Sequence, residues 1–214
     1  MKVLVTGATG FLGGYVVSEF ARSGYDVVAT GRNNARLQQL VDAATAAQAA
    51  ADPTDPTYPG TVTALVGDLA QLAELDLSVD VVVHAAALST VWGPWRDFYH
   101  TNVGGTQAVV DFCRRNAVRR LIFISSPSIY SQRGDRFHIT ESEFDPNNRL
   151  NNYIRSKIRA EQVAAEFAKG MIIKSIITPY RAHTPIPPPS RGHPRVETAK
   201  QGPYRSKPAR SSSP

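Results

Sequence analysis

The chain has 214 residues, a length suited to one domain or slightly more, and its 42% hydrophobic content is ordinary for a globular fold. The net charge of +6 does not indicate a nucleic-acid-binding protein, because eight of the 24 basic residues and one of the 18 acidic residues follow residue 170. No secretory leader and no apolar run of membrane-span length is visible, so we expect a cytoplasmic protein without a membrane span.

Short apolar and β-branched runs predict six strands. In chain order they are Lys2–Thr6, Asp26–Thr30, Thr61–Val66, Val79–His84, Arg119–Ser125 and Ile172–Ile177. Helical patterns lie between them at Phe11–Ser23, Asn33–Ala51, Gln71–Leu75, Thr101–Asn116 and Asn151–Lys169. Strands that alternate with helices predict an α/β fold with a doubly wound parallel sheet, the Rossmann architecture.

A glycine-rich loop joins the first predicted strand to the first predicted helix. Gly7 permits a tight turn, Gly10 lets the backbone approach a pyrophosphate, and Gly13 lets the helix pack closely on the strand. The amide groups at the start of the helix would then face the phosphates. The strand–turn–helix context favours a dinucleotide site over the alternative, a glycine-rich turn that binds nothing.

The end of the second strand indicates which dinucleotide is bound. Sites for NAD place a carboxylate there, whereas sites for NADP often place an arginine nearby. The sequence has Arg32 and no acid at this point, which favours NADP, although an ordinary surface arginine is the competing interpretation. Asp68, after the third strand, either lies near the adenine or caps the next helix.

Tyr153 and Lys157 are four residues apart and therefore share one face of a predicted helix. An ammonium group next to a phenol favours the phenolate form, so the pair is suited to exchanging a proton with a substrate hydroxyl or carbonyl group. Ser126, at the end of the fifth strand, could hold the substrate oxygen. A solvated helix face is the alternative interpretation of the Tyr-x-x-x-Lys spacing alone.

Taken together, six motifs resemble those of the extended short-chain dehydrogenase/reductase superfamily, the NAD(P)-dependent epimerase/dehydratase group. They are Thr6–Gly13, Asp68-Leu69, His84–Ala87, Asn102–Thr106, Ser125–Tyr130 and Tyr153–Lys157.

The resemblance implies roles for individual residues. It implies Tyr153 as acid/base, Lys157 holding the nicotinamide ribose, Ser126 orienting the substrate and Asn102 supporting an active-site water and the backbone. His84 is expected to serve the strand end rather than catalysis. The cofactor-binding residues implied are Gly7, Thr9, Gly10, Phe11, Leu12, Gly13, Arg32, Asp68, Leu69, Ala85, Ala86, Tyr153 and Lys157. No metal site is expected.

Within that group, Ser89–Trp95 and Ser125–Tyr130 resemble the 3β-hydroxysteroid dehydrogenase-like branch. That resemblance implies oxidation or reduction of a secondary alcohol or ketone on a hydrophobic substrate, of the 3β-hydroxysteroid or 2-alkyl-3-ketoacid type. A sugar-nucleotide epimerase or dehydratase, and a dinucleotide-binding fragment without activity, are the alternatives. Trp92 and Trp95 could line a pocket or pack in the core.

Two further expectations concern association and the single thiol. Family members often pair through the helix that carries the tyrosine, and the apolar Ile154, Ile158 and Val163 would permit a homodimer. Cys113, the single cysteine, lies in an apolar helical pattern and is expected to be a buried, inert thiol.

The composition changes after residue 177. Residues 178–214 are basic and rich in proline, so we expect a disordered tail after a Rossmann domain of residues 1–177. A nucleic-acid-binding arm is the alternative for this tail. The family's substrate-binding lobe is missing from the pattern, and a truncated or frameshifted reading frame is our hypothesis for the change.

Overall fold

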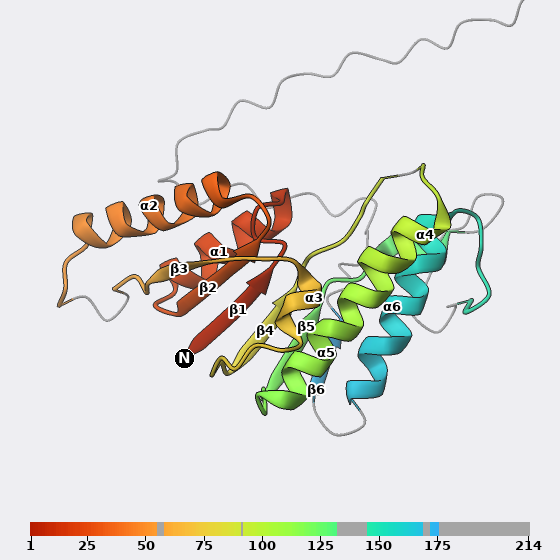
Figure 1. Ribbon diagram of the computed structural model, residues 1–214. Coiled ribbons are helices and arrows are strands. Elements are labelled where there is room, and N and C mark those ends of the chain that lie inside the picture. The colour runs from red at the N-terminus through yellow and green to blue at the C-terminus, as the bar shows by residue number, and fades with distance from the viewer. Residues whose placement is uncertain (55–57, 91, 132–144, 169–171, 176–214) are drawn as a thin grey trace, which may run out of the picture. The chain divides into compact units, whose positions relative to one another are not determined.

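The computed structural model describes residues 1–54, 58–90, 92–131, 145–168 and 172–175 (Figure 1). The predicted tail at 178–214, its predicted disorder and the predicted domain boundary at 177 lie outside these residues. In the part of the chain that the structure describes, no helix is both long enough and apolar enough to cross a bilayer.

Six parallel strands form one sheet, in the spatial order β3-β2-β1-β4-β5-β6. The strands are β1 (Lys2–Thr6), β2 (Asp26–Gly31), β3 (Val62–Val66), β4 (Val81–His84), β5 (Arg120–Phe123) and β6 (Ile172–Ser175). This confirms the predicted doubly wound parallel sheet, and every predicted strand is present, although β3, β4 and β5 are shorter than predicted and β2 is longer by one residue. The order reverses between β1 and β4, the switch point at which such sheets bind ligands.

The helices follow the predicted pattern with three differences, at the third helix, at the fourth helix, which was not predicted, and at the helix predicted for Thr101–Asn116. They are α1 (Phe11–Arg22), α2 (Asn34–Ala50), α3 (Leu69–Leu72), α4 (Trp95–Phe98), α5 (Gly105–Arg115) and α6 (Asn152–Ala168). A π-helical segment, η1 (Tyr99–Gly104), joins α4 to α5, and a 3-10 turn, η2 (Pro127–Tyr130), follows β5. The predicted single helix from Thr101 to Asn116 was therefore wrong in its first part, since the helical chain starts earlier and widens into a π turn.

Helix α3 begins earlier than predicted because Asp68 and Gln71 form a capping box at its start. The carboxylate of Asp68 accepts a hydrogen bond from the backbone of Ala70, and the side chain of Gln71 accepts one from the backbone of Asp68. Such reciprocal bonds satisfy the amides that a helix start leaves unpaired. The helix accordingly occupies Leu69–Leu72 and not Gln71–Leu75.

Alternate side chains of the strands build two hydrophobic layers, one on each face of the sheet. Leu4 and Leu121 belong to the layer under α3, α5 and α6, while Val5 and Val83 belong to the layer under α1 and α2. Figure 1 shows the two groups of helices on opposite faces. Each of the four residues of β4 is buried, as expected of a central parallel strand.

Candidate functional site

The glycine loop lies where β1 ends and α1 begins. Gly7 has a positive φ of 69°, and a Cβ atom there would lie 2.7 Å from the backbone N and Cα of Ala86. The loop thus approaches the chain after β4 too closely for any side chain at position 7. The backbone N–H of Gly10 donates to the carbonyl of Gly7 at 2.9 Å, which closes the turn.

Helix α1 begins without a side chain that caps it. Gly10 occupies the capping position in an extended conformation and offers no side-chain acceptor to the first amides of the helix. These amides and the positive end of the helix dipole are therefore free to meet an anion. The cap of α2 is different, because Asn33 accepts a hydrogen bond from the backbone of Arg36.

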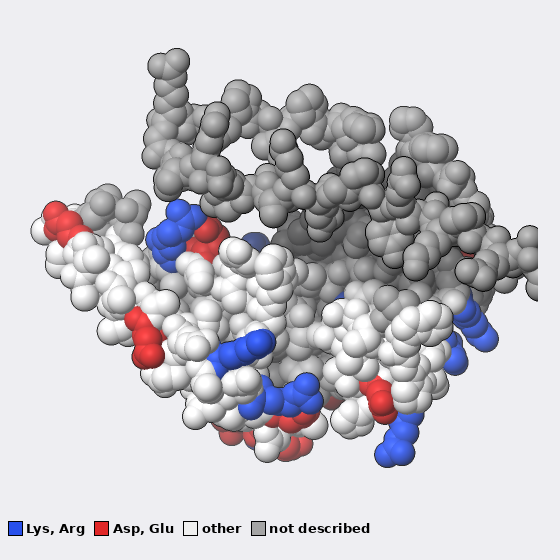
Figure 2. Space-filling model, turned by 90° about the horizontal axis from the view of Figure 1, so that it is seen from above, with Lys and Arg blue, Asp and Glu red and all other residues white. Residues whose placement is uncertain are grey.

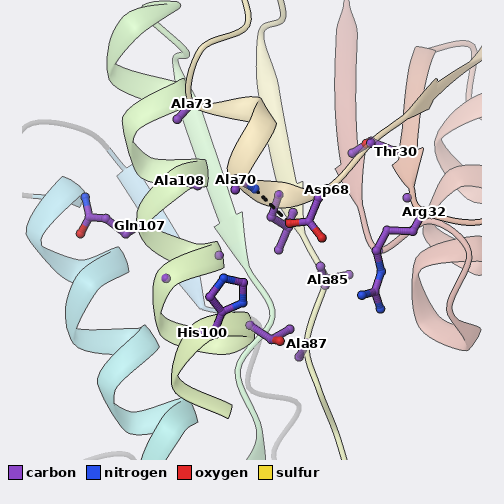
Figure 3. Close-up of a pocket in the computed structure, with 18 of the residues that line it drawn as sticks. Thr30, Arg32, Asp68, Ala70, Ala73, Ala85, Ala87, His100, Gln107 and Ala108 are labelled. Atoms are coloured by element: carbon purple, nitrogen blue, oxygen red, sulfur yellow. Dashed lines mark hydrogen bonds between the residues drawn. The ribbon is translucent and has the colours of Figure 1, made fainter. Parts of the chain in front are cut away.

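A cavity of about 610 Å³ opens beside this loop at the carboxyl ends of the strands (Figure 3). Its walls come from the glycine loop, the ends of β2 and β3, the chain after β4, η1 and α5. The lining residues are Gly7, Thr9, Gly10, Thr30, Gly31, Arg32, Gly67, Asp68, Leu69, Ala70, Ala73, Ala85, Ala86, Ala87, His100, Thr101, Gly104, Gly105, Gln107, Ala108 and Asp111.

Eight of the residues predicted for the cofactor are among those that line the cavity. They are Gly7, Thr9, Gly10, Arg32, Asp68, Leu69, Ala85 and Ala86. The other five are elsewhere. Phe11 and Leu12 are exposed on the first turn of α1, Gly13 is buried beneath Gly7, and Tyr153 and Lys157 belong to α6.

Two charged side chains, those of Arg32 and Asp68, line the cavity beside the ends of β2 and β3. Arg32 is exposed and, among the described residues, makes no hydrogen bond or ion pair. Asp68 both caps α3 and lines the cavity, so the two interpretations of this residue are compatible. Figure 3 shows Arg32 and Asp68 on one side of the cavity and His100 on the other. Figure 2, which views the molecule from above, shows basic and acidic side chains interspersed on that face.

Arg36 is a residue of this region that the sequence analysis missed. It lies in the first turn of α2, four residues after Arg32, and its guanidinium donates to the carbonyl oxygen of Thr9 at 3.2 Å. The bond ties α2 to the glycine loop. Its place in the first turn of the helix that follows the end of β2 was the signal that could have identified it.

Lys157 carries a buried ammonium group, with 3% of the residue exposed. Nζ donates to the carbonyl oxygen of Ile124 at 2.7 Å and lies 4.2 Å from the ring centre of Phe123. Burial lowers the pKa of Lys157 to about 8, and the charge of Glu161 opposes this shift. An ammonium has three donors, and one has an acceptor among the described residues.

Glu161 is the second charged group on this face of α6. Ser125 Oγ donates to its carboxylate at 3.0 Å, directly after β5. Burial raises the pKa of Glu161, while the hydrogen bond from Ser125 and the charge of Lys157 act in the opposite direction. Sequence reasoning missed this residue, and its position four residues after Lys157 was the available signal.

Tyr153 and Ser126 are two further residues of the predicted catalytic set. Tyr153 is half-buried in the first turn of α6, and its ring centre is 6.5 Å from that of Phe98. Among the described residues, no hydrogen bond engages its hydroxyl group. Ser126 precedes η2, and its Oγ lies 2.7 Å from Ser128 Oγ. Lys157 Nζ contacts the carbonyl oxygen of Ile124, directly after the end of β5, and Ser126 follows Ile124 by two residues in the chain.

Asn102 connects the cavity wall to the helix that carries Tyr153. It is buried in η1, the segment whose residues His100 and Thr101 line the cavity. Its side-chain oxygen accepts from the backbone of Leu88 at 2.7 Å, and its Nδ2 donates to Ser156 Oγ at 2.8 Å. Residues in π turns often serve functional sites, and this turn directs the Asn102 amide between two elements.

His84 is buried at the end of β4, with Nδ1 2.7 Å from Thr6 Oγ1 and Nε2 3.0 Å from Thr106 Oγ1. Burial lowers its pKa to about 3, with a further contribution from the charge of Lys157. The ring therefore holds the strand end as a neutral hydrogen-bonding group. Cys113 is also buried, as predicted, and desolvation raises the pKa of its thiol to about 12.

The expectations about the two tryptophans and about the apolar residues of a dimer surface need correction. Trp92 is 87% exposed, so it does not pack in the core, and Trp95 lies beneath the Arg155 guanidinium at 3.8 Å; neither lines the cavity. Ile154 and Ile158 are buried in a cluster with Ile129 and Tyr130 of the same chain. They are consequently not available as a dimer surface, and the homodimer stays a prediction without their support.

Comparison with known proteins gives a family. A model of the NAD dependent epimerase/dehydratase family matches residues 3–198 of this chain. The match continues beyond residue 177, where we had expected the resemblance to end. The sheet order and the glycine loop described above are consistent with that match.

Three relatives illustrate what the chain is similar to. The chain is 33% identical to the uncharacterized protein YbjS of Escherichia coli (strain K12), with 76% of this chain and 44% of the relative covered. It is 30% identical to a 2-alkyl-3-oxoalkanoate reductase of Stenotrophomonas maltophilia (strain K279a), with 60% and 34% covered. A solved structure of MoeE5 with UDP-glucose and NAD is 30% identical, with a TM-score of 0.62 and with 82% and 52% covered. The chain thus spans between about a third and about half of these relatives.

Proposed function

We propose that this chain, which belongs to the NAD-dependent epimerase/dehydratase family, binds NADP(H) and acts as an alcohol–ketone oxidoreductase on a hydrophobic substrate. The observation that carries the proposal is the buried ammonium of Lys157, one turn after Tyr153 on α6. Burial of an ammonium costs free energy, and groups destabilised in this way are frequent in functional sites; among the described residues no carboxylate lies within ion-pair distance of Lys157, although the charge of Glu161 acts on it.

The described residues fit a dinucleotide. The cavity lies at the switch point of the sheet, the amides of α1 lack a side-chain cap, and the absence of a side chain at Gly10 leaves the backbone accessible from the cavity. The glycine loop would hold the pyrophosphate, and Asp68 with the chain at Ala85 and Ala86 would adjoin the adenosine side. Lys157 would donate to the ribose next to the nicotinamide.

Each residue of the proposed set has a defined part in the chemistry. When bound, the nicotinamide cofactor supplies a hydride donor or acceptor. The Tyr153 hydroxyl gives a proton to the substrate oxygen in reduction and takes it back in oxidation. The Ser126 hydroxyl donates a hydrogen bond to the same oxygen. The Lys157 ammonium would hold the cofactor ribose on the face of α6 that also carries Tyr153.

The preference for NADP rests on Arg32. It lines the cavity at the end of β2, a strand end without a carboxylate, and is free among the described residues to meet a 2′-phosphate. We expect Arg32→Ala to weaken NADP+ binding by about 10- to 100-fold and to leave NAD+ binding unchanged. Arg22→Ala, an exposed arginine on α1 paired with Glu19, is the matched control.

The function test combines binding with turnover. NADPH-dependent reduction of a 2-alkyl-3-oxoalkanoate by the chain should be lost in Tyr153→Phe while NADP+ binding persists. Binding by the parent chain without turnover on this substrate would reject the oxidoreductase proposal for this chain and favour a cofactor-binding fragment. Absence of both NADP+ and NAD+ binding would reject the cofactor site itself.

A sugar-nucleotide epimerase or dehydratase is the second candidate. The likeness to MoeE5, solved with UDP-glucose and NAD, is the observation that favours it. The same Tyr153 and Lys157 would serve that chemistry. Interconversion of UDP-sugars with bound NAD, together with a preference for NAD+ over NADP+ in the titration, would support this candidate against the first.

A further inference from the structure

Five buried polar residues from five different elements are joined in a hydrogen-bonded series, in which the side chain of Thr106 connects to Asn102 through the backbone carbonyl of Asn102. Thr6, His84, Asn102, Thr106 and Ser156 belong to β1, β4, η1, α5 and α6, and each is at most 2% exposed. Polar groups buried this completely need hydrogen-bond partners inside the protein, and these five residues find them in one another and in nearby backbone groups. The series starts at the residue before Gly7 and ends at the backbone of Tyr153.

The direction of the first half of the series follows from its fixed ends. Thr106 Oγ1 donates its single proton to the carbonyl oxygen of Asn102 at 2.6 Å, so it must accept a proton from His84 Nε2. A neutral His84 then has an unprotonated Nδ1, which accepts from Thr6 Oγ1. Thr6 Oγ1 in turn accepts from the backbone N–H of Ala86 at 3.4 Å.

The second half is fixed in the same manner. The N–H of Leu88 can only donate, so the side-chain oxygen of Asn102 faces it and Nδ2 faces Ser156. Ser156 Oγ donates its proton to the carbonyl oxygen of Tyr153 at 2.7 Å and therefore accepts from Asn102. Every donor in the series meets an acceptor, and reversing any one bond would leave a buried polar atom unpaired.

We propose that Ser156, Thr106 and His84 are positioning residues that hold the first turn of α6, and with it Tyr153, in a fixed place relative to the glycine loop. This proposal rests on the proposed role of Tyr153 as the proton-transfer group. The series matters for that role because it joins Thr6, which precedes the loop, to the backbone of Tyr153 through bonds that have a single arrangement. An error of about 1 Å in the place of a reacting group can reduce the rate by about 100-fold.

Thr106 provides a matched set of variants. Thr106→Val removes the hydroxyl group and nearly keeps the volume, whereas Thr106→Ser keeps the hydroxyl group. Thr45→Val is the control, because the Thr45 hydroxyl on exposed α2 bonds to the carbonyl four residues earlier, as Thr106 does, but far along the chain from the series. Ser156→Ala removes the last bond of the series independently.

The experiment has two readouts. In the parent chain, long-range proton–nitrogen NMR spectra should show His84 as the Nε2–H tautomer, and an Nδ1–H tautomer would overturn the assigned direction. In Thr106→Val and Ser156→Ala, the Tyr153 resonances should shift and the turnover number should fall by about 100-fold with NADP+ affinity unchanged, whereas Thr106→Ser and Thr45→Val should resemble the parent.

The outcomes separate this proposal from the proposed function. A parent chain without turnover refutes the oxidoreductase proposal, and the tautomer and the Tyr153 resonances still decide the positioning series. Tyr153 resonances that stay in place in Thr106→Val and in Ser156→Ala would overturn the series even in an active protein. If Thr106→Val does not fold, Ser156→Ala decides the outcome against Thr45→Val.

Discussion

Gly13 lies against Gly7 in such close contact that a Cβ atom at position 13 would overlap the carbonyl oxygen of Gly7 and lie 2.7 Å from its carbonyl carbon. The two glycines therefore act as one unit. The first turn of α1 can approach β1 because position 13 has no side chain, and this approach sets the curvature of the loop that borders the cavity.

Gly13→Ala should displace the loop. We expect a loss of about 1–3 kcal/mol in the free energy of unfolding, since the new methyl group has backbone atoms in its place, and a marked loss of NADP+ affinity. Urea denaturation and a cofactor titration measure the two effects. The control is Gly14→Ala, whose Cβ would meet Ala8 O at 3.5 Å and Leu40 Cδ2 at 4.0 Å, both ordinary contacts.

Gly14→Ala should fold at least as well as the parent, because alanine favours a helix over glycine by about 1 kcal/mol. Equal stability and equal NADP+ affinity in Gly13→Ala and Gly14→Ala would show that the contact between Gly13 and Gly7 does not shape the loop.

Lys157 should make stability depend on pH in the alkaline range. Its pKa is about 8 in the folded chain against an ordinary value of 10.5, so the unfolded chain binds more protons between these values. The free energy of unfolding should therefore gain a contribution as pH rises from 8 to 10.5, of at most about 3 kcal/mol. Denaturation of the parent and of Lys157→Met across this range isolates the effect.

The free energy of unfolding of the parent, relative to that of Lys157→Met, should increase as pH rises. A constant difference from pH 8 to 10.5 would mean that the Lys157 ammonium is not destabilised by burial, contrary to its position with 3% of the residue exposed.

Much of the fold was predictable because its signals are local. The apolar strands and the glycine loop each occupy a few consecutive residues. Short, right-handed connections between parallel strands then restrict the possible strand orders of the sheet. The π turn at Tyr99–Gly104 was not predictable, since its residues also suit an α-helix and the widening accompanies bonds from Asn102 to the distant Leu88 and Ser156. The positioning series was hidden for the same reason, as its partners are far apart in sequence.

Cys113 should be unreactive in the folded chain. Its thiol is buried and burial raises its pKa to about 12, so the thiolate is almost absent at pH 8. We expect a disulfide reagent to label the native chain more slowly than the urea-unfolded chain by roughly 1000-fold or more, because labelling requires opening. Rapid labelling of native protein at pH 8 would place Cys113 on an accessible surface and contradict its position on the buried face of α5.

The neutral state of His84 predicts acid sensitivity. Its pKa is lowered from 6.5 to about 3, so between these values the unfolded chain binds a proton that the folded chain excludes. The free energy of unfolding should fall as pH decreases from 6.5 towards 3, by at most about 5 kcal/mol from this residue. In His84→Gln, which can still donate to Thr106, this contribution disappears. The parent should therefore be the more stable protein near neutrality, and its advantage should shrink on acidification. If the advantage stays constant down to pH 4, His84 is not held neutral, and the direction assigned to its hydrogen bonds loses its basis.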